Sequence, residues 1–155
     1  MALTCRAGRL CRASGRPVWS HVADLEAFED RARARIGAIQ RRPPGPPAQG
    51  TVWSGKADVM GKKRDVTVTA ATIETWSRLT AEAATDGMQV NIDVDLAELG
   101  PRLTRLTVTT EARARSLAAR LMLQSAKLAR KTLAKRYKGR ISDLAARIEK
   151  SAAKG

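Results

Sequence analysis

The C-terminal stretch from Glu111 to Lys154 reads EARARSLAARLMLQSAKLARKTLAKRYKGRISDLAARIEKSAAK. It contains no proline and a single glycine, Gly139, and it is rich in Ala, Leu, Arg and Lys, which lose least on becoming helical. As one helix of about forty residues it would extend roughly 60 Å at ~1.5 Å per residue. We expect a helix over residues 111–150, followed by a short tail at 151–155, and we expect it to cover a sheet formed by residues 1–110.

The apolar residues of this stretch form two stripes. In the second half they recur at steps of three and four, the spacing of one helical face: Leu133, Tyr137, Ile141, Leu144 and Ile148. In the first half the stripe is Leu117, Leu121 and Leu128. The step of five between the stripes indicates either a bend near residues 129–132 or two halves that bury different faces. We favour one helix whose second half grips the sheet.

The residues before this stretch alternate between apolar and polar positions. The clearest example is 88–96, which follows the hairpin dipeptide Asp86-Gly87. Similar alternation predicts strands at 3–13, 36–42, 51–60, 65–70, 78–83, 88–96 and 104–110. Two short helices are expected between the first two strands, one after Ser14 and one from Asp24 to about Ala34. Because only one face of each strand is apolar, the pattern predicts a curved antiparallel sheet of about seven strands within an α+β domain spanning residues 1–155.

Charge and composition narrow the classes of partner. The 155-residue chain has a net charge of +14, and residues 111–154 hold thirteen Lys or Arg against three acids. This excess favours an anionic membrane surface or a nucleic acid as partner, with a merely solvated basic surface as the alternative. No apolar run approaches the ~20 residues that span a bilayer, so we expect a cytoplasmic protein. Two cysteines and one histidine, without metal-ligand spacing, favour neither a metal site nor a cofactor.

Few residues suggest catalysis. His21 and Asp24 lie close together in sequence, but we interpret His21 as a polar helix position and Asp24 as a helix cap or turn residue. Asp93 and Asp95 share one strand face, as paired carboxylates do in acid–base catalysis. That face is the polar one, opposite the predicted cavity, so a structural role is favoured. No catalytic residue is assigned.

The order of elements and several local motifs resemble the START-like superfamily, also called SRPBCC, which groups polyketide cyclases/dehydrases with lipid-transfer proteins. The matching segments lie along nearly the whole chain: Ser14–Trp19 with Val22–Asp24, Gly50-Thr51, Gly100–Thr104 and Ile148-Glu149. The resemblance implies a helix-grip fold with a cavity between the curved sheet and the C-terminal helix. It also implies a hydrophobic or amphipathic small molecule, or a lipid, as ligand, and no particular reaction.

Combining the alternation with this resemblance gives a candidate ligand site. The expected cavity lining is Trp53, Ala57, Val59, Val66, Val68, Leu79, Ala81, Val90, Ile92, Val94, Leu106, Val108, Leu133 and Tyr137. The expected contacts with an anionic surface are Lys127, Lys131, Lys135 and Lys138. We therefore expect a non-enzymatic binding protein. The alternatives are docking on an anionic membrane or, less favoured, nucleic acid through the basic helix, and a polyketide cyclase/dehydrase-like enzyme.

Overall fold

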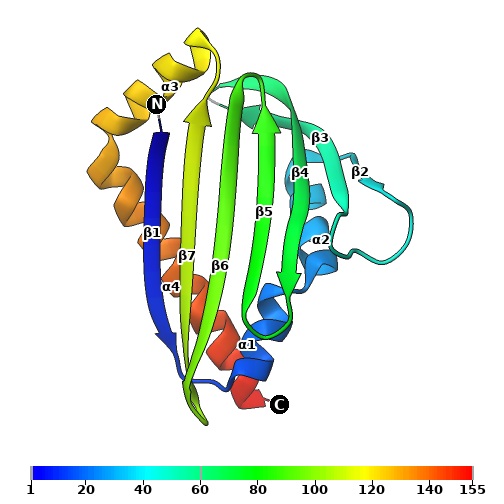
Figure 1. Ribbon diagram of the computed structural model, residues 1–155, viewed down its shortest axis with the longest axis vertical. Helices are drawn as coiled ribbons and strands as arrows, with labels where there is room; N and C mark the ends of the chain where they lie inside the picture. Colours follow the sequence, from blue (N-terminus) through cyan, green and yellow to red (C-terminus); the bar gives the residue numbers. More distant parts are fainter. Residues whose placement is uncertain (1, 60, 155) are drawn as a thin grey trace.

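A computed structural model describes residues 2–59 and 61–154, which form seven strands and four helices (Figure 1). In chain order they are β1 (Ala2–Cys11), α1 (Gly15–Val22), α2 (Leu25–Ile36), β2 (Ile39–Arg42), β3 (Val52–Val59), β4 (Lys62–Glu74), β5 (Arg78–Thr85), β6 (Met88–Gly100), β7 (Leu103–Ala114), α3 (Leu117–Leu128) and α4 (Arg130–Lys154).

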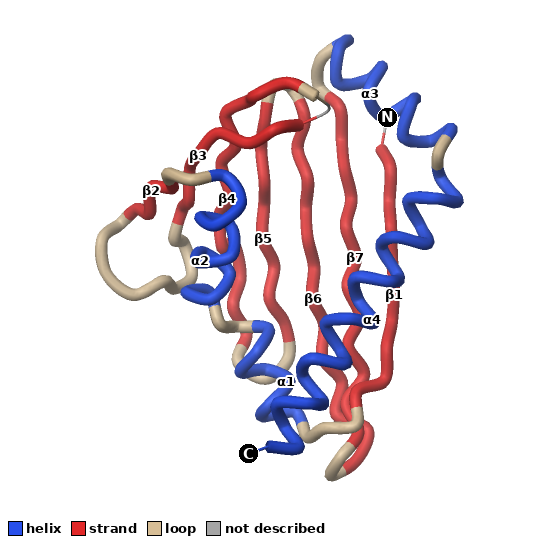
Figure 2. Tube along the Cα trace, turned by 180° about the vertical axis from the view of Figure 1, so that it is seen from behind, coloured by secondary structure: helices blue, strands red, loops and turns tan. Residues whose placement is uncertain are grey.

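All seven strands belong to one antiparallel sheet in the order β1-β7-β6-β5-β4-β3-β2. The strands from β2 to β7 follow one another as neighbours, whereas β1 pairs with β7 and closes the opposite edge. The sheet is curved, and all the helices lie on its concave side (Figure 2). The predicted helix-grip architecture is confirmed.

Local sequence signals account for several boundaries. Gly87 adopts φ of +74°, the left-handed conformation that the predicted hairpin between β5 and β6 requires. Asp24 caps α2 by accepting a hydrogen bond from the backbone N–H of Ala27 at 3.0 Å, as predicted. Ser14 occupies the corresponding position before α1, but its side chain makes no capping hydrogen bond.

The C-terminal helical segment begins later than the sequence predicts. Residues 111–114 continue β7, and helix begins only at Leu117, where the Ser116 side chain accepts a hydrogen bond from Ala119. The short Glu-Ala-Arg-Ala run favours helix by propensity, yet β1 and β6 lie on either side and pair with it. Tertiary pairing therefore overrides local propensity here.

The segment is also two helices and not one. It is interrupted at Ala129, the residue between the two apolar stripes, whose N–H bonds to the carbonyls of Ala126 and Lys127. The two alternatives for the step of five both occur: the segment is interrupted near the predicted bend, and α3 buries a different face, Ala119 and Leu123, outside the predicted leucine stripe.

Several strand boundaries also differ from those predicted; β6, for example, continues to Gly100, past the predicted end at residue 96. The first strand ends at Cys11 and not at residue 13, and Ile36 closes α2 so that the second strand begins at Ile39. β4 extends through a register shift between Ala70 and Thr72 to Glu74. The predicted end of the third strand, Met60, lies outside the described residues.

The second half of α4 packs on one end of the sheet. Ile141, Ala145 and Ile148 are buried there. Together with residues of β1, the loop after it, α1, β6 and β7, they form the closed core: Ala7, Cys11, Ala13, Val18, Trp19, Leu96, Leu106 and Val108. The Glu149 carboxylate accepts a hydrogen bond from the backbone N–H of Arg12 at 2.9 Å. The predicted gripping half of the helix is thereby joined to the chain just after β1.

Replacing Ile148 tests this contact. Its side chain is fully buried, so Ile148→Ala is expected to lower the free energy of unfolding by about 3 kcal/mol through lost burial and a residual cavity. Leu128→Ala is the matched control on the same segment, because Leu128 is 92% exposed and its truncation should change stability by less than about 0.5 kcal/mol. Urea denaturation measures both. Equal effects of the two substitutions would show that α4 does not hold the sheet.

Candidate functional site

The concave face of the sheet is apolar but incompletely covered. Its central strands present Val66, Val68, Ala81, Ala83, Val90 and Ile92, all of them half-buried. The register aligns them in cross-strand rows, with Val68 opposite Ala83 and Ala83 opposite Val90. The views place α2 over the β2–β3 side and α4 over the β1 side, leaving the central strands between them (Figure 2). Solvent therefore reaches an apolar floor flanked by two helices.

A buried carboxylate fixes the α2 side of this floor. Glu29, which is 4% exposed, accepts a hydrogen bond from Trp53 Nε1 at 3.3 Å. Its two oxygens also pair with Arg33 at 2.8 Å and Arg41 at 3.1 Å. Because Arg41 and Trp53 come from β2 and β3, these contacts hold α2 against the edge of the sheet. Pairing with two cations compensates the cost of burying the Glu29 charge.

A small apolar cavity of about 70 Å³ lies beneath α2. Phe28 and Trp53 meet there edge to face with ring centroids 5.9 Å apart. The remaining lining residues are Glu29, Ala32, Ile36, Ile39, Ser54, Gly55, Ala57, Val66 and Val68. This cavity adjoins the floor because Val66 and Val68 line both.

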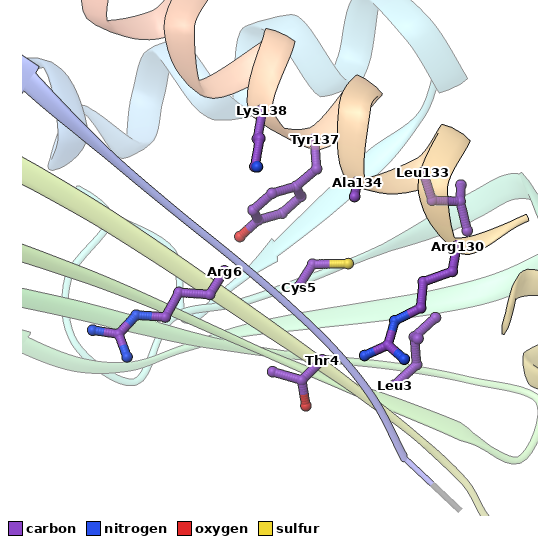
Figure 3. A pocket seen from close by; sticks show the side chains of 9 residues that line it. All are labelled: Leu3, Thr4, Cys5, Arg6, Arg130, Leu133, Ala134, Tyr137 and Lys138. Carbon is purple, nitrogen blue, oxygen red and sulfur yellow. The ribbon is translucent and has the colours of Figure 1, made fainter.

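A second pocket, of about 180 Å³, lies between the first half of α4 and β1. Its lining is Leu3, Thr4, Cys5, Arg6, Arg130, Leu133, Ala134, Tyr137 and Lys138 (Figure 3). The side chains of Tyr137 and Cys5 lie next to each other between the helix and the strand. Arg130 and Lys138 are its cations on the helix side, whereas the Arg6 side chain extends to the far side of β1 (Figure 3). With two cations and no carboxylate, the pocket favours an anionic group.

Tyr137 spans the space between α4 and the sheet. Its hydroxyl donates a hydrogen bond to the Val108 carbonyl at 2.9 Å and lies 3.1 Å from Thr110 Oγ1. Burial raises the pKa of the Tyr137 phenol above its ordinary value, while the hydrogen bond with Thr110 partly opposes the rise. Burial likewise raises the pKa of the Cys11 thiol in the closed core. Tyr137 is therefore a neutral hydrogen-bonding group at neutral pH.

The structure distributes the predicted cavity lining over three surroundings. Trp53, Ala57, Val66 and Val68 line the cavity under α2, and Leu133 and Tyr137 line the pocket beside β1. The residues that lie half-buried on the sheet without lining either pocket are Val59, Leu79, Ala81, Val90, Ile92 and Val94.

Two residues of the predicted lining belong elsewhere. Leu106 and Val108 are 0% and 7% exposed in the closed core, packed beneath the second half of α4. Neither residue lines either of the two pockets, and their place in a ligand cavity stays a prediction. Sequence reasoning also missed Leu3, Cys5 and Phe28. Alternation along β1 already placed Leu3 and Cys5 on one face, but nothing in the sequence placed that strand beside α4.

The remaining polar candidates have local structural roles. His21 Nδ1 lies 3.1 Å from the Pro17 carbonyl within α1. Asp93 and Asp95 lie on the outer face of the sheet beside Arg78, as the strand alternation predicted. The pKa of Asp95 is raised, first by desolvation and then by the negative charge of Asp93.

Lys127, Lys131, Lys135 and Lys138 are all exposed. Within residues 2–59 and 61–154, no three His, Cys, Asp or Glu side chains gather in a way that could hold a metal ion. None of the helices described is both long and apolar enough to cross a membrane.

Comparison with known proteins identifies the fold. No protein-family model and no curated protein sequence matches the chain. The structure is similar to the Zhui aromatase/cyclase from Streptomyces sp. R1128, with a TM-score of 0.65, 15% identity, and coverage of 96% of this chain and 94% of that one. Norcoclaurine synthase from Thalictrum flavum gives a TM-score of 0.68 at 11% identity, covering 100% of this chain and 88% of that one.

A START superfamily protein from Mycobacterium smegmatis gives a TM-score of 0.57 at 18% identity, covering 91% of this chain and 98% of that one. At these identities the likeness establishes the fold. The chain has the START-like (SRPBCC) fold, as the order of its sequence motifs predicted. The solved proteins that share this fold include an aromatase/cyclase, a synthase and a protein described only by its superfamily.

The single tyrosine of the chain makes the pocket beside β1 directly observable. In the native protein, the phenolate absorbance of Tyr137 is expected to appear at a pH above its ordinary pKa of 10.0. Thr110→Val should raise this pKa further, because it removes a hydrogen bond that lowers it. The pKa of Tyr137 is higher in the folded protein than in the unfolded chain. The contribution of the protonated phenol to the free energy of unfolding is therefore complete below the unfolded-state pKa and is lost as pH rises through the folded-state pKa. A native titration at the unfolded value would contradict the burial of Tyr137.

Proposed function

We propose that this protein binds a hydrophobic or amphipathic small molecule, such as a lipid, on the concave face of its sheet between α2 and α4. The observation that supports this most is the half-buried apolar floor, with Val90 and Ile92 at its centre. Large apolar surface is rarely left accessible to water unless it binds something. Here that surface is concave and has pockets on both sides, as ligand sites usually do.

The polar groups around the floor indicate what kind of ligand fits. Arg130 and Lys138 line the pocket beside β1, and the same pocket contains the neutral hydroxyl of Tyr137. A ligand with an apolar body and an acidic or hydrogen-bonding head group matches this distribution. Ligand sites commonly measure about 300–1,000 Å³, more than either pocket alone. The ligand body is therefore expected to lie across the floor, with its head group beside α4.

The arrangement favours binding over catalysis. Among the described residues that line the two pockets, the one carboxylate is Glu29, and its oxygens are occupied by Arg33, Arg41 and Trp53. A general acid–base mechanism needs a group free to exchange a proton with the substrate. The similarity to an aromatase/cyclase and a synthase keeps a cyclase-type enzyme as the second candidate, with Tyr137 as the group to test.

The exposed lysines of α3 and α4 support attraction to polyanions without identifying one. A membrane surface and a nucleic acid both satisfy this charge. Nucleic acid is the less favoured partner, because the aromatic side chains that would stack on bases are not interleaved with the basic residues. The cytoplasm remains the predicted location.

The ligand can be sought directly on the purified protein. Native mass spectrometry followed by organic extraction is expected to show a hydrophobic molecule bound with a stoichiometry near one. A dansyl-labelled fatty acid then serves as a defined probe, and its fluorescence reports binding to the emptied protein. A protein that carries no such molecule and does not bind the probe would contradict the proposal.

Two neighbouring substitutions locate the site. Ala81→Trp places a large ring on the apolar floor and is expected to weaken probe binding roughly tenfold or more by filling the ligand's space. Glu82→Trp places the same ring on the outer face, where Glu82 is exposed, and should leave binding unchanged. Probe binding that responds equally to both substitutions would exclude the concave face as the site.

A further inference from the structure

The α3 helix exposes apolar residues on the side facing away from the protein. Leu117, Leu121 and Leu128 follow one another at steps of four and seven, which places them on one helical face. They are 74%, 57% and 92% exposed, whereas Ala119 and Leu123 on the other side are buried. We call Leu117, Leu121 and Leu128 the leucine stripe. Because the inner face of α3 already packs on the protein, its outer apolar face needs a second apolar surface to contact.

The stripe is conspicuous within the described residues. Among their exposed large hydrophobic side chains, Leu117 and Leu128 are the two most exposed, and the stripe places three such residues on a twelve-residue helix. The others lie apart from it on different elements: Leu10, Phe28, Trp76 and Leu99. Scattered exposed leucines are ordinary, but a cluster of this kind marks an interaction surface.

The charges around the stripe indicate the chemistry of the partner. Residues 112–142 contain ten Lys or Arg and no Asp or Glu. Four of these cations lie on α3 or at the beginning of α4, beside the stripe, and all are exposed: Arg120, Lys127, Arg130 and Lys131. Apolar side chains flanked by cations match the interface of an anionic bilayer, where leucines enter the acyl boundary and cations meet lipid headgroups.

We propose that α3 is a membrane-docking helix, which lays the leucine stripe into the surface of an anionic lipid bilayer. A second copy of the chain fits less well, because pairing two stripes would bring together two clusters of positive charge. A nucleic acid fits less well too, because leucines add nothing to phosphate contacts and α3 carries no aromatic residue for base stacking.

The position of α3 relates docking to the pocket beside β1. Both views place α3 at the end of the molecule opposite the C-terminus, beside the beginning of β1 (Figures 1 and 2). Arg130 and Leu133 of the following helix line that pocket (Figure 3). A docked α3 thus holds the pocket close to the headgroups, where an amphipathic molecule could pass between bilayer and protein. The docking proposal itself does not depend on such a ligand.

Vesicle sedimentation with the full chain tests the docking helix. The protein is expected to bind vesicles of mixed phosphatidylcholine and phosphatidylserine. Its affinity for vesicles of phosphatidylcholine alone should be lower by about tenfold or more. Added salt should weaken binding because it screens the headgroup contacts. Indifference to lipid charge, or no binding at low salt, would overturn the proposal.

Matched variants separate the stripe from general hydrophobicity. The triple variant L117Q/L121Q/L128Q keeps good helix formers and is expected to weaken binding to the anionic vesicles about tenfold or more. The control L10Q/L99Q changes two exposed leucines on other elements and should bind as the native chain does. Equal losses in both would overturn the assignment to α3. If the unfolding midpoints of both variants match that of the native chain, a loss of vesicle binding is not caused by misfolding.

A second pair of variants separates local from net charge. K127Q/K131Q and R147Q/K150Q remove the same total charge from exposed positions, but the second pair lies near the C-terminus, at the other end of the molecule from the stripe (Figure 1). The first pair of substitutions should reduce the affinity for vesicles several-fold more than the second. Equal losses would show that only net charge matters and would overturn the proposal.

Sedimentation velocity without lipid tests whether the stripe instead contacts a second copy of the chain. Suppose that the native chain is a dimer, and that the triple glutamine variant is a monomer that binds vesicles as well as the native chain does. The stripe would then be an interface with a second copy of the chain, and the proposal would be overturned.

Discussion

The burial of the last turns of α4 against β1 and α1 is the contact on which the rest of the structure depends. Ile148 is fully enclosed there, and the next residue, Glu149, accepts the backbone N–H of Arg12. This contact holds the end of the chain to the strand at its beginning. A straight helix held at one end of a curved sheet separates from it toward the other end. The inner face is therefore closed at one end and accessible at the other.

This geometry places different chemistry at the two ends. The closed end is apolar and tightly packed, and its stability comes from burial. On the accessible side, Glu29 holds α2 away from α4 by pairing it with the far edge of the sheet. The apolar floor, the pocket containing Tyr137 and the basic helix α3 follow in that direction. The proposed ligand floor and the proposed docking helix lie on this same side of the molecule, as the two proposals together require.

The structure also shows why local reasoning about the C-terminal segment was partly wrong. Residues 111–114 have helix-favouring side chains, but neighbours on both sides draw them into β7. Leu106 and Val108 alternate like the other inward residues, yet they are fully or almost fully buried, whereas Val90 and Ile92 are only half-buried. Alternation identifies the face on which a residue lies. It carries no information on which part of that face a distant helix will cover.

The sequence by itself determined the alternating strands, the hairpin at Asp86-Gly87, the gripping stripe of α4 and the START-like order of elements. These features are local or periodic, and so each is encoded within a few neighbouring residues. Only the tertiary structure decided the pairing of β1 with β7, the break at Ala129, and the separation of closed core from accessible floor. It also decided that the leucine stripe faces outward. Those features depend on contacts between residues far apart in the chain, and no local pattern specifies them.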